Sequence, residues 1–128
     1  MRRGHRGYVA SRPCLGERAP QHVQNLVIRD HARRHGLTFL LSATEYAMPG
    51  SFKMLETVLD ELPTLDGVIL YSLLLLPPEP ERRLIVYRRV LAAGATLHAA
   101  LESLVIADFD DARHAEDILM VRAAVQGG

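Results

Sequence analysis

The sequence predicts an α/β protein, a small flavodoxin-like or Rossmann-like three-layer sandwich with a parallel sheet between helices. Short apolar runs of strand length alternate with segments of helical periodicity, and the strand candidates are almost continuously apolar, as in sheets buried on both faces. The 128 residues, 48% of them hydrophobic, suffice for one compact domain over residues 1–128. Because crossovers between parallel strands are right-handed, few strand orders are possible for a sheet of four strands, and we expect the order 2-1-3-4.

The first half of the chain contains two predicted strands separated by a helix. The run at residues 7–11 predicts a buried strand, and residues 20–35 predict a helix with Pro20 in its first turn. Its expected apolar positions are Val23, Leu26, Val27 and Ile28. Gly36 is suited to end this helix, and the run at residues 38–42 predicts the second strand.

The same pattern continues in the second half. Ser51 is a candidate N-cap for a helix to residue 62, and strands are expected at residues 67–71 and 96–101. Three prolines precede a helix over residues 79–93, which Gly94 ends. A last helix is expected at residues 108–126, where acidic residues favour its N-terminus.

Composition excludes several classes of protein. The single cysteine, Cys14, cannot form an internal disulfide or a cysteine-based zinc site. Basic and acidic residues number 15 each, although residues 1–44 carry an excess of +6 (8 against 2) and residues 45–128 an excess of −6 (7 against 13). A neutral total argues against nucleic-acid binding. No apolar run reaches membrane-spanning length, and no signal peptide is recognisable, so we expect a cytoplasmic protein with no membrane partner.

Ligands of such sheets bind beyond the carboxyl ends of the strands, at the switch point beside the first strand. The loop from Ser11 into the first helix has the outline of an anion site, because free amides and the helix dipole favour a phosphate there. Arg12, Arg18, Gln21 and His22 are the candidate phosphate ligands. The alternative is a loop held by internal pairs, such as Arg18 with Glu17 or Glu45.

Two carboxylates follow strand ends and are the candidate acid–base or nucleophilic groups. Glu45 with Tyr46 follows the second strand, and Glu102 follows the fourth. Ser72, after the third strand on the same rim, is a further candidate substrate ligand. Ser11 is a candidate nucleophile with His22 as the nearest base. The alternatives are a salt bridge for Glu45 and an ordinary surface position for Glu102.

Metal and cofactor motifs are missing from the sequence. His31 and His35 are four residues apart, but beside Arg33 and Arg34 they are interpreted as a solvated helix surface rather than a metal site. The same solvated interpretation applies to Arg82, Arg83, Arg88 and Arg89. Neither GxGxxG nor GxxxxGK[ST] occurs, and we predict no cofactor.

The segments at residues 11–30 and 41–48 resemble the sporadic carbohydrate cluster protein family, with similarity over nearly the whole chain. The family is named for gene neighbourhoods that build unusual sugars and surface polysaccharides. The resemblance implies a pathway rather than a reaction.

Two further resemblances concern the fold. Gly7-Tyr8-Val9, Gln21, Gln24 and two strands resemble the catalytic domain of serine recombinases. The sequence departs from that family where Leu73 to Pro78 replaces an arginine cluster, and Ser11 is one position out of register with the nucleophile. The proline-containing loop and rim glutamate are similar to nucleoside deoxyribosyltransferases, which implies Glu45 or Glu102 as nucleophile in N-glycosidic chemistry.

These observations predict an enzyme of carbohydrate or nucleotide-sugar biosynthesis that binds a phosphorylated sugar or nucleotide sugar, with Ser11, Arg12, Arg18 and Gln21 on the phosphate. The first alternative is a non-catalytic partner subunit that docks through the apolar stretch at residues 73–78. An N-glycosidic hydrolase or transferase and a DNA strand-exchange enzyme are further alternatives. A homo-oligomer is expected because a small core is marginal alone.

Overall fold

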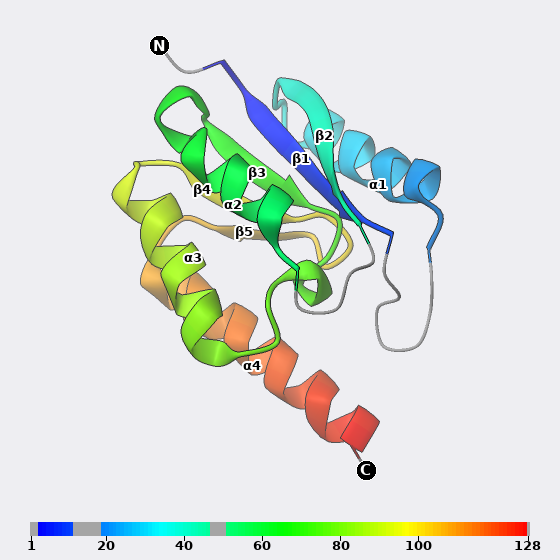
Figure 1. Ribbon diagram of the computed structural model, residues 1–128, viewed down its shortest axis with the longest axis vertical. Coiled ribbons are helices and arrows are strands. Elements are labelled where there is room, and N and C mark those ends of the chain that lie inside the picture. Colours follow the sequence, from blue (N-terminus) through cyan, green and yellow to red (C-terminus); the bar gives the residue numbers. More distant parts are fainter. Residues whose placement is uncertain (1–2, 12–18, 47–50, 128) are drawn as a thin grey trace.

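The computed structural model describes residues 3–11, 19–46 and 51–127, without the side chains of the last two (Figure 1). Its helices are α1 (Gln21–Arg34), α2 (Lys53–Asp60), α3 (Pro80–Ala92) and α4 (Phe109–Gly127), with short 3₁₀ turns η1 (Leu62–Thr64) and η2 (Leu73–Leu75). The strands are β1 (His5–Ala10), β2 (Phe39–Glu45), β3 (Gly67–Leu70), β4 (Thr96–Ala99) and β5 (Leu104–Ile106). The predicted α/β class is confirmed.

The described strands form one sheet in the order β2-β1-β3-β4-β5. Strands β1 to β4 are parallel and lie in the predicted order, but the prediction of four strands was wrong because β5 adds an antiparallel edge. The reversal occurs in a turn in which Ser103 has a positive φ of 53°. Strand β2 also runs on to Glu45, beyond the predicted end at residue 42.

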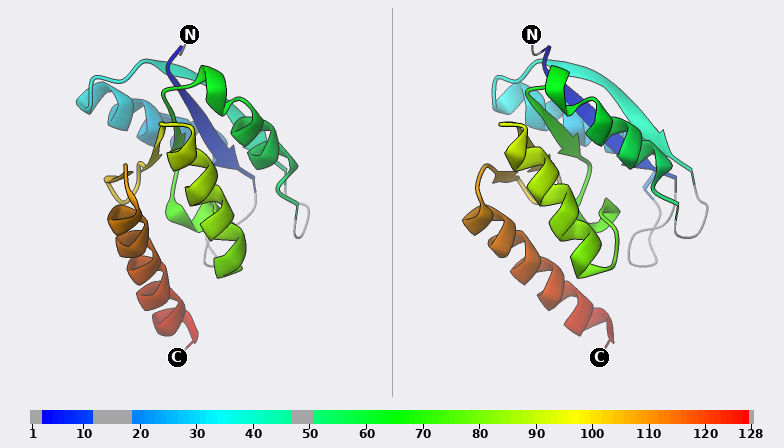
Figure 2. Two further views of the ribbon diagram at one scale, coloured as in Figure 1. Left: turned by 90° about the vertical axis from the view of Figure 1, so that its left-hand side faces the viewer. Right: turned by 60° about the vertical axis from the view of Figure 1, so that its left-hand side comes forward.

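Helix α1 covers one face of the sheet, and α2, α3 and α4 cover the other (Figures 1 and 2). The larger core lies under the three helices and joins Tyr8, Leu70 and Leu97 of the sheet to Leu55 and Val86 of α2 and α3. The smaller core lies under α1 and contains Val9, Ile28, Ala32, Ile69 and Ala100. No described helix combines the length and apolar character needed to cross a membrane.

The buried stripe of α1 differs from the predicted one. Leu26 is 63% exposed, whereas the buried positions are Gln24, Ile28, His31 and Ala32. Gln24 can be buried because both polar atoms of its side-chain amide have a partner. The oxygen accepts from Ala10 N (3.0 Å), and the nitrogen donates to Ala10 O (2.7 Å). The helix is thereby attached to the carboxyl end of β1.

Histidines form a polar layer in the smaller core, and the interpretation of His31 as a solvated residue was wrong. His31 is 0% exposed, and its Nε2 shares a hydrogen bond of 2.9 Å with Nδ1 of His98. Nε2 of His98 shares another with Thr96 Oγ1 (2.9 Å), and the His5 ring lies edge-on to His98. His35, at the surface, stacks on His31.

Burial keeps these rings neutral. It lowers the pKa of His98 to about 3 and that of His31 to about 4, with a smaller contribution from repulsion by neighbouring histidines. Burial also lowers the pKa of His5, against the opposing attraction of Asp66. Gly67 makes room for the layer, because a Cβ there would meet the Thr96 carbonyl oxygen and approach Cδ2 of His5 to 2.8 Å.

Candidate functional site

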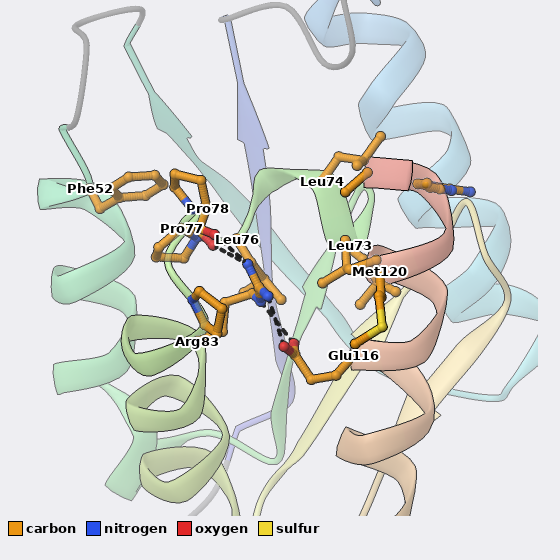
Figure 3. Close-up of a pocket in the computed structure, with 13 residues that line it drawn as sticks. Phe52, Leu73, Leu74, Leu76, Pro77, Pro78, Arg83, Glu116 and Met120 are labelled. Carbon is orange, nitrogen blue, oxygen red and sulfur yellow. Dashed lines mark hydrogen bonds and ion pairs between the residues drawn. The ribbon is translucent and has the colours of Figure 1, made fainter. Parts of the chain in front are cut away.

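A pocket of about 610 Å³ lies at the carboxyl ends of the parallel strands, between η2, the start of α3 and the C-terminal half of α4 (Figure 3). This is the edge of the sheet where ligands of parallel α/β folds bind. The lining residues come from four parts of the chain: Phe52, Leu73, Leu74, Leu76, Pro77, Pro78, Pro80, Arg83, Glu116, Leu119, Met120, Arg122 and Ala123.

The apolar stretch after β3 forms one wall of the pocket. Leu73 and Leu75 are fully buried and Leu76 is 4% exposed, so most of this stretch joins the core instead of making the exposed sticky surface considered from the sequence. Leu74 is partly exposed and lines the pocket. The opposite wall includes Met120, which is 70% exposed.

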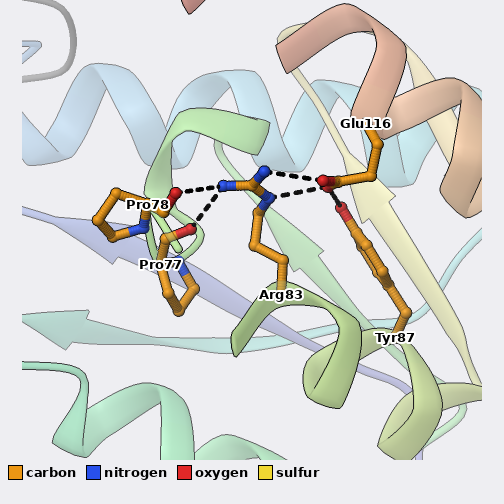
Figure 4. Close-up of polar contacts among 5 residues, drawn as sticks. All are labelled: Pro77, Pro78, Arg83, Tyr87 and Glu116. Atoms are coloured by element: carbon orange, nitrogen blue, oxygen red, sulfur yellow. Dashed lines mark hydrogen bonds and ion pairs between the residues drawn. The ribbon is translucent and has the colours of Figure 1, made fainter. Parts of the chain in front are cut away.

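A cluster of charged and aromatic groups spans the space between α3 and α4 (Figure 4). Arg83 donates from Nε to Glu116 Oε2 (2.8 Å) and from Nη2 to Oε1 (2.7 Å). Its Nη1 donates to the carbonyl oxygens of Pro77 and Pro78. The Tyr87 hydroxyl donates to Glu116 at 2.6 Å. The solvated interpretation of Arg83 was therefore wrong, and its side chain is only 11% exposed.

The ionisation of this cluster follows from its contacts. Burial alone would raise the pKa of Glu116, but hydrogen bonds from Arg83 and Tyr87 outweigh it, and the pKa lies below its usual value. Burial and the hydrogen bond to Glu116 raise the pKa of Tyr87. The cluster is thus an ion pair with a neutral phenol. A smaller hollow of about 350 Å³ also touches Glu116 and extends to Leu84 and Phe109.

Ser72 and Glu102, both predicted site residues, are brought together beside the pocket. Glu102 accepts from Ser72 Oγ (2.7 Å), from Leu73 N (3.1 Å) and from Arg122 Nη1 (2.8 Å). Ser72 Oγ in turn accepts from Leu74 N. The Glu102 side chain is 4% exposed. This carboxylate therefore fastens η2 and α4 to the end of β4.

Glu45 has a comparable structural position at the end of β2. It is 2% exposed and accepts from the Tyr8 hydroxyl (2.8 Å) and from the amides of Met54 and Leu55 (3.1 Å each). These amides belong to the first turn of α2, so the carboxylate satisfies donors that a helix leaves unpaired. Phe52, and not the predicted Ser51, is the N-cap residue of this helix, and its side chain makes no capping hydrogen bond.

The other predicted site residues are more dispersed. Tyr46 is 67% exposed, and Gln21 and His22 are exposed on the first turn of α1. Ser11 is half-buried, and its hydroxyl donates to the carbonyl oxygen of Glu45 at 3.4 Å. Arg12, Arg18, Glu17 and Cys14 lie outside the described residues. Within the described ranges, no group of three or more potential ligand side chains is placed to hold a metal ion.

Sequence reasoning missed Arg83, Tyr87 and Glu116 as parts of a site. Arg83 and Tyr87 are four residues apart and therefore share a face of α3, which the sequence does show. Their partner Glu116 lies beyond two strands, and only the fold brings it close. Comparisons with protein-family models, with curated proteins and with solved structures find no match to this chain.

Proposed function

We propose that the protein acts by binding, as a non-catalytic component that holds a small organic ligand in the pocket between η2, α3 and α4. The supporting observation is the pocket itself: its volume lies in the range of small-molecule sites, and its lining is mainly apolar with a few fixed polar groups. It also lies at the sheet edge where such folds bind ligands.

The contacts of the two rim carboxylates favour binding over acid–base chemistry at these positions. Glu45 accepts two hydrogen bonds from the start of α2 and one from the Tyr8 hydroxyl of β1, and Glu102 accepts three that hold η2 and α4. A general acid or nucleophile must approach a substrate atom within hydrogen-bond distance. Both side chains are instead buried against the protein.

The proposal is tested with N-phenyl-1-naphthylamine, a neutral dye whose fluorescence increases in apolar sites. We expect saturable binding by the wild-type protein and loss of binding in Ala123→Trp, which fills the pocket from an exposed position on α4. Ala124→Trp is the matched control, because Ala124 is exposed on the same helix and does not line the pocket. Equal dye binding by the two variants contradicts the proposal.

An enzyme or binding protein for a phosphorylated sugar or nucleotide sugar at the junction of β1 and α1 is the second candidate. Among the described residues no side chain caps α1, and its first turn lacks acidic residues, whereas those of α2, α3 and α4 contain them. An uncapped helix start beside β1 favours an anion. Thermal-shift titration with glucose 1-phosphate and UDP-glucose tests this, with Arg12→Ala and Arg18→Ala expected to lose the shift. Unchanged shifts in both variants contradict it.

A further inference from the structure

Most polar atoms in the wall of the pocket already have a partner within the protein. Ten of its thirteen lining residues are apolar. Arg83 uses Nε and Nη2 on Glu116 and Nη1 on two proline carbonyls. Both oxygens of Glu116 accept from Arg83, and one also accepts from Tyr87. Arg83 and Glu116 are therefore paired with each other, and Arg122, the third polar residue of the wall, donates from Nη1 to Glu102.

The charges of the lining also balance. Arg83 pairs with Glu116, and Arg122 pairs with Glu102 next to the pocket. A charged group entering the pocket would lose its hydration without gaining an unpaired partner of opposite charge. The electrostatics of the lining therefore match an uncharged occupant.

Hydroxyl-rich ligands fit this lining poorly. Each sugar hydroxyl buried without a partner weakens binding by about tenfold. A hydrocarbon chain needs no such partner, and each buried methylene tightens binding by about fourfold. The exposed Met120 side chain adds a flexible wall that adapts to a chain.

We infer that the pocket between η2, α3 and α4 takes the aliphatic chain of a free single-chain amphiphile, whose polar head remains at the mouth in water. This inference rests on the proposed ligand-binding function and names the class of its ligand. A sugar or phosphate head on such a molecule contributes solubility, and the chain contributes the affinity.

The experiment is a displacement series with hexyl, octyl and decyl glucoside, each below its micelle-forming concentration, against bound N-phenyl-1-naphthylamine. The head is constant, so the series isolates the chain. We expect each pair of added methylenes to lower Kd by about 15-fold, and Ala124→Trp to reproduce the wild-type series. Methyl glucoside and glucose 1-phosphate, which lack the chain, should displace no dye.

The outcomes separate this inference from the proposed function. If dye binding is lost in Ala123→Trp but Kd is independent of chain length, or methyl glucoside displaces the dye as well as decyl glucoside does, the pocket binds ligands and the inference of a chain is wrong. If Ala123→Trp and Ala124→Trp bind the dye equally, the proposed function itself fails. If light scattering shows a dimer that Ala123→Trp alone dissociates and decyl glucoside leaves intact, the occupant is a second copy of the chain, which also overturns the inference.

Discussion

Arg83 of α3 and Glu116 of α4 face each other across the space between the two helices and pair through two contacts of 2.7 and 2.8 Å. The pair borders the pocket and, through Glu116, the smaller hollow beside Leu84. Arg83 also holds the carbonyl oxygens of Pro77 and Pro78, so one side chain links α3, α4 and the segment after η2. The width of the pocket therefore depends on this arginine.

Arg83→Met is expected to lower the free energy of unfolding by about 2–3 kcal/mol, because Glu116 would be left partly buried without its cation. Urea denaturation followed by circular dichroism measures the change. The control is Arg33→Met, since Arg33 is exposed and its pair with Asp30 lies within the single helix α1. We expect a change within about 0.5 kcal/mol there. Equal losses of unfolding free energy in the two variants would show that the pair of Arg83 and Glu116 stabilises the protein no more than an exposed ion pair does.

Glu45→Ala is expected to lower the free energy of unfolding by about 2–4 kcal/mol, because two helix amides and the buried Tyr8 hydroxyl lose their acceptor. Glu45→Gln keeps an acceptor oxygen and should lose about 1 kcal/mol. Tyr46→Ala, at the exposed neighbouring position, is the control and should change stability by less than about 0.5 kcal/mol. Chemical denaturation that finds Glu45→Ala as stable as wild type would contradict the structural position described for this carboxylate.

Stability should depend on pH through the buried histidines. The pKa of His31 is about 4 and that of His98 about 3 in the folded protein, both below the ordinary value of 6.5. Unfolding then takes up protons below pH 6.5. The free energy of unfolding is therefore at its full value above that pH and falls as the pH drops toward 4, by about 1.4 kcal/mol per pH unit for each histidine.

Urea midpoints at several pH values between 7.5 and 4.5 measure this slope. His31→Gln should reduce the proton uptake on unfolding by about one proton and so make the slope shallower. His114→Gln, at an exposed position on α4, should leave it unchanged. Identical slopes for wild type and His31→Gln would place the proton uptake elsewhere. Asp30 and Glu116, whose pKa values are lowered, act in the same direction only at more acidic pH.

Gly67→Ala is expected to lower the melting temperature markedly, since the new methyl group would meet the backbone of Thr96 and the ring of His5. The backbone of Thr96 cannot move aside as a flexible side chain can, so we expect the free energy of unfolding to fall by more than about 2 kcal/mol. Gly36→Asn is the comparison, because Gly36 has a positive φ of 66° but open space around it, and Asn tolerates that conformation. Gly36→Asn should lose less than about 1 kcal/mol. Similar melting temperatures for the two would contradict the close packing at Gly67.

The alternation of strands and helices could be predicted because continuous apolar runs and helical spacing are local signals. Strand β5 could not be predicted in the same way. It has three residues, only one of them fully buried, and it depends on the turn at Ser103 to bring it beside β4. The order of the first four strands followed from general rules of chain connection.

The sequence predicted a site at the carboxyl edge of the sheet but placed it beside the first strand, whereas the pocket lies between η2, α3 and α4. Glu45 and Glu102 are at that edge, but the hydrogen bonds that occupy them come from helix amides and from a serine, which a linear pattern does not show. The burial of His31 had a readable signal that was missed, because His31 repeats at helical spacing with Gln24 and Ile28. Arg33 and Arg34 lie on the solvent side of α1, and their charge led to the wrong prediction that His31 is exposed as well.

The antiparallel direction of β5 decides which end of α4 completes the pocket. Because the chain reverses before this strand, α4 starts at the opposite edge of the sheet and brings Leu119, Met120 and Ala123 up to η2. The wall of the pocket that α4 forms is therefore positioned by the antiparallel edge strand β5, and not by a crossover between two parallel strands. Substitutions along the second half of α4 can accordingly change the shape of the pocket while the four parallel strands keep their sequence.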